Sequence, residues 1–270
     1  MTLDLRCNVP QTITNAKSSP HNMKQLYRTI IIALFAFPVF ASDLIGVLND
    51  DARTKADQAR DQRDRPEVII SLLDISEGDQ VADIFAGGGY YSQLLAAVVG
   101  RKGKVLLHNN AAYREFAAEG IKARFQKHKP GNLIMHNAET DDLKLGNGKL
   151  DAAMIVMSYH DIYFVDEENS WETIDSAAFL TQVFNALKPG GRFLIVDHAA
   201  APGSGKSSAQ TLHRIDPAFA EIDIEQYGFE LVAESPVLRN PMDDYAMSVF
   251  EPSIRGKSDR FVHVYAKPIR

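Results

Sequence analysis

Short apolar runs that alternate with amphipathic segments make up most of the chain from residue 76 onward. The runs predict seven strands, at 80–84, 104–108, 133–136, 150–157, 192–196, 229–234 and 261–266. Segments with apolar residues at helical spacing lie between them, at about 90–99, 113–125, 173–187 and 213–227. The alternation of strand and helix predicts an α/β fold, in which the apolar run 150–157 is a central parallel strand. A long loop is expected at 241–258, before the last strand.

Residues 42–75 predict helices that lie over the sheet. The first begins with apolar residues at 44, 47 and 48, and the strongly charged stretch 53–65 is expected to be a solvated helical face. Pro66 suits the first turn of another helix over 67–73, whose buried stripe would be Val68, Ile69, Leu72 and Leu73.

Residues 23–41 have the pattern of a secretory signal peptide. Lys24 and Arg28 form a positive start, an apolar run follows from Ile30, and Val39-Phe40-Ala41 is a small-x-small cleavage signal. We therefore expect cleavage after Ala41 and an exported, periplasmic protein, with a retained membrane anchor or a buried helix as the alternatives. Residues 1–22 are polar, and we interpret them as an unstructured upstream extension, with translation starting at Met23.

The composition, 45% hydrophobic and 24% charged over 270 residues, is sufficient for one full α/β core. Loss of residues 1–41, which hold four bases and one acid, changes the formal net charge from −6 to −9. Such a surface disfavours nucleic acid and stable association with anionic membranes. The only cysteine, Cys7, lies in the part expected to be removed, so the mature chain would have no disulfide and no cysteine ligand for a metal.

The stretch 81–92, VADIFAGGGYYS, carries the strongest functional signal. An apolar strand ends near Asp83, and three glycines then bring the backbone N–H groups close to a nucleoside-type ligand at the start of a helix. In the dinucleotide fingerprint the first glycine directly ends the strand, and amides face a pyrophosphate. The carboxylate of Asp83 instead favours a cationic ligand such as the sulfonium and ammonium of S-adenosylmethionine, although the residue could also be a plain helix cap.

Several motifs together resemble a known enzyme family. Asp83 with Gly87-x-Gly89, Asp151 at the start of the fourth strand, and Leu187-Lys188-Pro189-Gly190-Gly191 resemble class I S-adenosylmethionine-dependent methyltransferases. More narrowly, Arg60-Asp61, Tyr159-His160-Asp161 and Arg260-Phe261 look like a family of predicted bacterial methyltransferases, several of them exported. The resemblance covers roughly residues 50–268.

This resemblance implies a Rossmann-like domain over 76–270, with a seven-stranded, mostly parallel sheet and an antiparallel last strand inserted beside the strand at 192–196. The cofactor would lie at the carboxyl ends of the strands. Asp83, Gly87 and Gly89 would hold its methionine part, and valine at position 89 should remove binding without unfolding the chain. Phe85 replaces the usual first glycine, and Asn109 and Asn137 replace the usual acids for ribose and adenine, with Glu139 as a substitute. Ser158 is a further expected cofactor contact.

Candidate residues for the acceptor side follow the fourth and fifth strands. His160 is the expected proton acceptor, assisted by Asp161, and the expected substrate contacts are Tyr159, Tyr163, Asp197 and His198. The alternative for His160 is a satisfied structural histidine, and His213 is a weaker candidate for the pocket. No His-x-x-x-His or comparable spacing occurs, so the sequence predicts no metal.

Three functions remain to be compared. The first is methyl transfer to a small molecule, whose identity would depend on the loops 159–172 and 199–215. Tyr163, Phe164 and Trp171 indicate an aromatic or apolar wall there. The second is a degenerate methyltransferase fold that binds a small ligand without catalysis, suggested by the two asparagines. The third, a nicotinamide-dependent oxidoreductase, is disfavoured by Asp83 and by the missing acid about 20 residues on. Nothing in the sequence indicates an oligomeric state or a nucleic-acid substrate.

Overall fold

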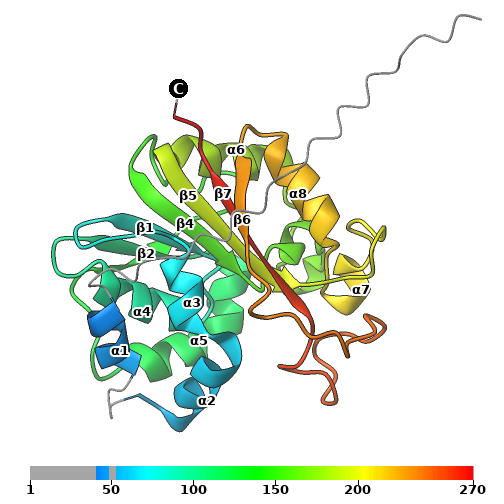
Figure 1. Cartoon of the computed structure of the whole chain (residues 1–270), viewed down its shortest axis with the longest axis horizontal. Helices are drawn as coiled ribbons and strands as arrows, with labels where there is room; N and C mark the ends of the chain where they lie inside the picture. Colours follow the sequence, from blue (N-terminus) through cyan, green and yellow to red (C-terminus); the bar gives the residue numbers. More distant parts are fainter. Residues whose placement is uncertain (1–40, 49–52, 270) are drawn as a thin grey trace, which may run out of the picture. The chain divides into compact units, whose positions relative to one another are not determined.

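The computed structural model describes residues 41–48 and 53–269, which contain one seven-stranded sheet (Figure 1). Its strands are β1 (Gln80–Ile84), β2 (Lys104–Asn109), β3 (Leu133–Asn137), β4 (Leu150–Val156), β5 (Leu187–His198), β6 (Glu230–Glu234) and β7 (Arg260–Ala266). They lie in the order β3-β2-β1-β4-β5-β7-β6. The pairs among β1 to β5 are parallel, and β7 is antiparallel to both β5 and β6. The expected fold class and the position of the last strand are confirmed.

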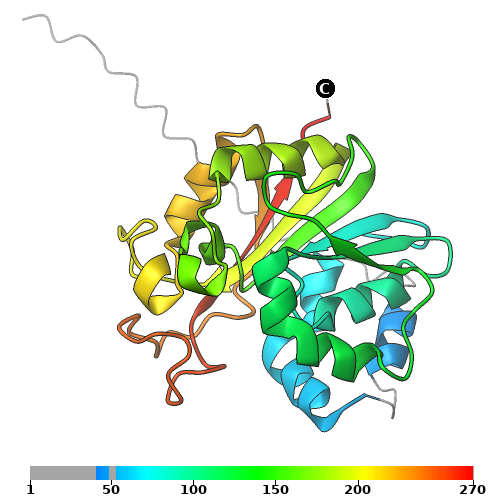
Figure 2. The ribbon, with the colours of Figure 1, turned by 180° about the vertical axis from the view of Figure 1, so that it is seen from behind.

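Helices cover both faces of the sheet, as the two opposite views show (Figure 1 and Figure 2). They are α1 (Ala41–Leu48), α2 (Lys55–Asp64), α3 (Pro66–Ser71), α4 (Tyr90–Val98), α5 (Ala111–Phe125), α6 (Ser176–Ala186), α7 (Ala209–Leu212) and α8 (Pro217–Glu225), with short 3₁₀ helices η1 (His160–Tyr163) and η2 (Glu167–Asn169). The apolar stripes of α1, α3 and α4 contribute to one core, and those of α6 and α8 contribute to the other. Each face of the sheet is therefore buried, which explains the nearly continuous apolar strands.

Two regions differ most from the predicted elements. The strand expected from 192 begins at Leu187, because Gly190 takes a left-handed conformation and donates its N–H to Lys267, so the Lys-Pro-Gly-Gly segment pairs with the chain after β7. The helical region expected near 213–227 is confirmed as α8, but it begins later, because His213 is left-handed and caps α7. A new helix, α8, begins at Pro217 with the Asp216 carboxylate as its cap.

The predicted upstream extension, and the predicted signal peptide apart from Ala41, lie outside the described residues. Ala41 itself is the first residue of α1. No helix within 41–48 and 53–269 is long and apolar enough to cross a membrane.

The predicted solvated face over 53–65 is present, because most residues of this stretch are exposed, but the opposite side of α2 is buried. Arg53, Asp57 and Asp64 are buried, and each is paired with an opposite charge. Asp57 binds Arg124 of α5 at 2.8 Å, and the Nε of Arg124 donates to the Gly88 carbonyl in the glycine-rich turn. The helix α2 is thus held to that turn by charge pairs that sequence periodicity cannot reveal.

Asp64 is the centre of this network. Its Oδ1 lies 2.7 Å from Nη1 of Arg260, the first residue of β7, and its side chain also accepts from Arg60 and Arg63 at 2.8 Å. Burial alone would raise the pKa of Asp64, but the hydrogen bond from Arg63 and the charges of Arg260 and Arg60 hold it well below its usual range. The carboxylate is therefore ionised and joins the N-terminal helices to the last strand.

We predict that Asp64→Asn lowers the free energy of unfolding by about 3 kcal/mol, because Arg260 would then be buried without a full counter-charge. Urea unfolding at neutral pH measures the difference. The matched control is Glu67→Gln, which removes an exposed pair with Arg65 at 2.7 Å and should change stability by less than about 1 kcal/mol. Similar small losses in both variants would contradict a stabilising role for the buried network.

Candidate functional site

The glycine-rich turn between β1 and α4 has a left-handed backbone at three residues. Phe85, Gly87 and Gly89 have φ values of 53°, 55° and 77°. A left-handed phenylalanine costs roughly 1–2 kcal/mol. Here its buried ring stacks on Tyr113 and Phe179, with centroids 4.8 and 5.4 Å apart, so packing offsets that cost. This explains how the chain departs from the usual glycine at position 85 and keeps the turn.

Asp83 lies at the carboxyl end of β1, directly before this turn, and only 2% of it is exposed. Its Oδ2 accepts a 2.6 Å hydrogen bond from Ser92 Oγ on α4. Burial raises the pKa of Asp83 to about 6, against the opposing effects of Ser92 and Arg60. The residue therefore joins strand and helix, and its carboxylate is costly to ionise unless a cationic group binds nearby.

The two glycines of the turn differ in what surrounds them. A Cβ at Gly87 would meet no atom within 4 Å. A Cβ at Gly89 would lie 2.7 Å from Leu107 Cδ1 and from Phe125 Cε2. Position 89 therefore requires a glycine for its left-handed backbone and for internal packing, which does not support the expectation that valine there would leave the fold intact. Gly87 is the position that is open for a ligand.

The asparagine predicted to bind ribose has a different partner. Asn109, at the end of β2, accepts from Gly87 N and donates to Gly87 O, both at 3.0 Å. Both the oxygen and the nitrogen of its amide thus help to hold the turn. Asn137 is exposed at the end of β3, beside Asn109 in the register. Glu139 is also exposed, and it accepts from Ala111 N at 3.0 Å and pairs with Arg114 at 3.1 Å.

The acceptor candidates lie at the neighbouring strand ends. His160 and Asp161 come from η1 after β4, whereas Asp197 is near the end of β5. All three are buried. Asp197 accepts from His160 N at 2.7 Å and lies 2.9 Å from His160 Nδ1, while Asp161 Oδ1 lies 3.1 Å from His160 Nε2. The imidazole is therefore bracketed by two carboxylates.

This bracket determines the charge of His160. Burial would lower its pKa, but the charges of Asp161 and Asp197 outweigh burial and raise the pKa to about 10. Conversely, His160 holds the pKa of Asp161 well below its usual range despite burial. The imidazolium has both nitrogens engaged, so this arrangement does not favour the predicted proton-acceptor role of His160.

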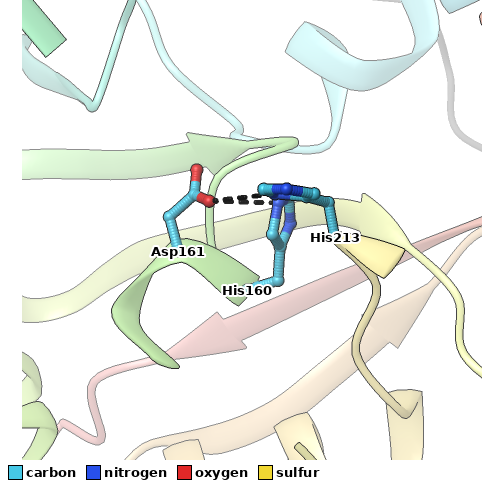
Figure 3. A group of neighbouring side chains, drawn as sticks. All are labelled: His160, Asp161 and His213. Carbon is cyan, nitrogen blue, oxygen red and sulfur yellow. Dashed lines mark ion pairs between the residues drawn. The ribbon is translucent and has the colours of Figure 1, made fainter. Parts of the chain in front are cut away.

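His213 completes the group and was underestimated from sequence (Figure 3). It follows α7 in a left-handed conformation, its Nδ1 lies 3.8 Å from Asp161 Oδ1, and 19% of its side chain is exposed. Phe164 and Phe250 each lie with ring centroids 4.7 Å from it. No local sequence pattern marks His213 as a neighbour of His160, because the two residues are more than 50 positions apart in the sequence and only the fold brings them together.

The predicted aromatic wall forms in part. Trp171 lies against Tyr113 and Phe164, with centroids 5.0 and 5.7 Å apart, and thereby extends the aromatic side of the His213 environment. The loops 159–172 and 199–215, expected to contact a substrate, do meet at this place.

Other predicted contacts have internal partners. The hydroxyls of Tyr159 and Tyr163 both donate to Asp223 of α8, and Tyr159 is fully buried, so the structure does not support Tyr159 as a substrate contact. Ser158 Oγ donates to Val156 O at 3.2 Å. His198 Nδ1 lies 2.7 Å from Ser258 Oγ, and burial together with the charge of His160 lowers its pKa.

The argument from spacing that excluded a metal does not hold. Ligand atoms of His160, Asp161 and His213 all lie within 4.8 Å of one another. Two sequence segments supply them, so a search for one local motif could not find the group. In the part of the chain described here, two cavities of about 220 and 420 Å³ lie at the amino ends of the strands, around Asp79 and Lys104, and neither adjoins this group.

Comparison with known proteins identifies the family. Residues 75–232 match the family described as methyltransferase domain. The chain belongs to this family. The narrower resemblance to exported bacterial members stays a prediction. No curated protein matches the chain in sequence.

Solved structures share the fold at low sequence identity. A SAM-dependent methyltransferase from Aquifex aeolicus has 18% identity and a TM-score of 0.54, over 84% of this chain and 98% of that one. Geranyl diphosphate C-methyltransferase from Streptomyces coelicolor, a complex with Mg²⁺ and S-adenosyl-L-homocysteine, has 14% identity and a TM-score of 0.52, over 83% and 88%. The [4+2]-cyclase SpnF has 12% identity and a TM-score of 0.54, over 86% and 93%. At these identities the likeness establishes the fold alone.

We predict that Asp83→Asn stabilises the protein at pH 8 by about 3 kcal/mol, because the folded state no longer holds a buried carboxylate. The folded pKa, about 6, lies above the ordinary value of 3.8, so the wild type loses stability as the pH rises through this window. The advantage of the variant should fall to about half at pH 5. Denaturant unfolding of both proteins at pH 5 and pH 8 measures this, and a pH-independent difference would contradict it.

We predict that alanine lowers stability at both glycines, but more at Gly89 than at Gly87. Gly87→Ala should cost about 1–2 kcal/mol of stability, for the left-handed backbone, and should weaken binding of S-adenosylhomocysteine at least tenfold. Gly89→Ala should cost about 1–3 kcal/mol more, because its Cβ overlaps Leu107 and Phe125. Urea unfolding and calorimetric titration of each variant give the two readouts. Unchanged affinity in a folded Gly87→Ala protein would place the ligand away from this turn.

Proposed function

We propose that this chain is an S-adenosylmethionine-dependent methyltransferase that acts on a small molecule. The observation that carries the proposal is the shared edge of β1 and β4, which pair in parallel with Asp83 beside Met154. The glycine-rich turn and the segment from Ser158 to Asp161 therefore leave the sheet side by side. A cofactor on the turn would present its methyl group toward the group formed by His160, Asp161 and His213.

In this proposal the two halves of the site have separate tasks. Asp83 and the backbone of Gly87 hold the methionine part of S-adenosylmethionine, which supplies the electrophilic methyl group. His160, fixed by Asp197, keeps Asp161 oriented, and the partly exposed His213 faces the acceptor. Positioning an acceptor heteroatom in line with the methyl group contributes most of the rate, up to roughly 7–11 kcal/mol in favourable cases.

The acceptor chemistry follows from the same environment. Phe164, Trp171 and Phe250 offer an apolar wall beside two histidines and a carboxylate. This combination suits a small, partly aromatic or apolar molecule with one polar acceptor atom. The acidic balance of the chain, −6 overall, supports a substrate other than nucleic acid.

A second candidate function is ligand binding without methyl transfer. The observation that favours it is the amide of Asn109, which is buried and is bonded to Gly87 through both its oxygen and its nitrogen, in place of an acid that would accept from a ribose. The cyclase among the structural neighbours further shows that this fold also serves other reactions.

We also propose export to the periplasm, on the sequence pattern of residues 23–41. The location bears on function, because S-adenosylmethionine is expected to be scarce outside the cytoplasm. A fusion of residues 1–60 to a reporter that is active only after export would test the proposed periplasmic location separately from the methyltransferase activity.

Calorimetric titration with S-adenosylmethionine, S-adenosylhomocysteine and NAD tests the proposal. We predict binding of the first two and none of NAD. Stabilisation by S-adenosylhomocysteine should reach about 2.7 kcal/mol at 100 times its dissociation constant. Binding of NAD alone would overturn the proposal.

The two candidate functions are then separated by turnover. Small hydroxyl, amine and thiol compounds are screened with S-adenosylmethionine, and release of S-adenosylhomocysteine is measured. Release that depends on one acceptor supports the methyltransferase, whereas tight cofactor binding without release across the screen favours the binding protein.

A further inference from the structure

Three possible metal ligands converge at the acceptor side of the site. Figure 3 shows His160 and Asp161 on η1 and His213 beyond α7, with the Asp161 carboxylate directed at both rings. Asp161 Oδ1 lies 3.1 Å from His160 Nε2 and 3.8 Å from His213 Nδ1. All three ligand atoms lie within 4.8 Å of one another.

The two buried ligands, His160 and Asp161, are each oriented by a hydrogen-bond partner outside the group. Asp197 Oδ1 lies 2.9 Å from His160 Nδ1, which directs Nε2 toward Asp161 and His213. The Tyr113 hydroxyl donates to Asp161 Oδ2 and leaves Oδ1 for the centre of the group. A carboxylate behind a ligating histidine and a hydrogen bond to the second oxygen of a ligating carboxylate are regular features of metal sites.

The distances fit one ion after a small movement. Bonds of about 2.0–2.2 Å from a metal to nitrogen and oxygen place neighbouring ligand atoms about 3 Å apart. His160 and Asp161 already have this separation. His213 Nδ1 has to move roughly 1 Å closer to Asp161 Oδ1. His213 is the partly exposed residue of the three, and it directly follows the four-residue helix α7.

We propose that His160 Nε2, Asp161 Oδ1 and His213 Nδ1 bind one divalent transition-metal ion. Two imidazoles and one carboxylate suit Fe²⁺, Co²⁺, Mn²⁺ or Zn²⁺, and the incomplete set leaves coordination positions for water or another small ligand. Phe164 and Phe250 pack against the His213 ring, so those positions would adjoin an apolar surface.

Metal binding is independent of methyl transfer and can be measured without S-adenosylmethionine. One consequence rests on the proposed function: an ion at this place would bind an acceptor oxygen or nitrogen and lower its pKa before transfer. The alternative is that the three groups only pair with one another, as a buried ionic cluster. The experiment has to separate these two states.

The test uses the full chain, stripped with a chelator and titrated with Co²⁺ in the absence of other ligands. We expect one equivalent to bind, with visible absorption bands of a cobalt site that contains nitrogen ligands. His213→Ala should weaken binding at least 100-fold, and Asp161→Asn should do the same. His128→Ala, which removes an exposed histidine outside the group, is the matched control and should bind as the wild type does.

Circular dichroism confirms that each variant is folded. X-ray absorption of the wild-type zinc form gives a second measurement that needs no variant, and it should show two imidazole ligands. Absence of a stoichiometric cobalt site in the wild type would overturn the proposal, as would unchanged affinity in folded His213→Ala. Loss of methyl transfer with intact metal binding would affect only the proposed function.

Discussion

The fold of this molecule depends on one constraint: each buried carboxylate requires a cationic or hydrogen-bonding partner. A carboxylate without a partner in the interior would cost several kcal/mol, so each one fixes the position of the segment that supplies its partner. Asp64 fixes α2 to β7, Asp57 fixes it to α5, and Asp197 fixes η1 to β5. Asp243, in the loop before β7, holds the fully buried Arg214 through two hydrogen bonds, at 2.8 and 3.1 Å. These pairs connect loops and helices to the sheet in a region without a cysteine.

The same constraint explains what the sequence could predict and what it could not. Strands and most helices were predictable, because apolar periodicity is a local property. The partners of buried charges were not predictable, because Asp64 and Arg260 are 196 residues apart. The charged stretch 53–65 has the composition of a surface helix, and only the tertiary partners of Arg53, Asp57 and Asp64 show that one side of it is buried. His213 was underestimated for a similar reason, since its neighbours come from η1.

The glycine-rich turn shows how a departure from a family pattern can be absorbed. Phe85 takes the backbone conformation that a glycine would take, and its ring fills the space between Tyr113 and Phe179. Asn109 then supports the turn from β2 instead of offering an acid. The family resemblance predicted the positions of these residues correctly but not their partners. Their side chains support the shape of the glycine-rich turn.

The Asp64–Arg260 pair also has a consequence for the order in which the chain can fold. The last strand, β7, lies between β5 and β6, so the sheet cannot be completed until residues 260–266 have emerged from the ribosome. Asp64 has no buried cation from β7 until that moment, and the N-terminal helices cannot reach their final position earlier. A fold dominated by such distant contacts forms slowly. Completion of the sheet and of the charge network around Asp64 is therefore one of the last steps of folding.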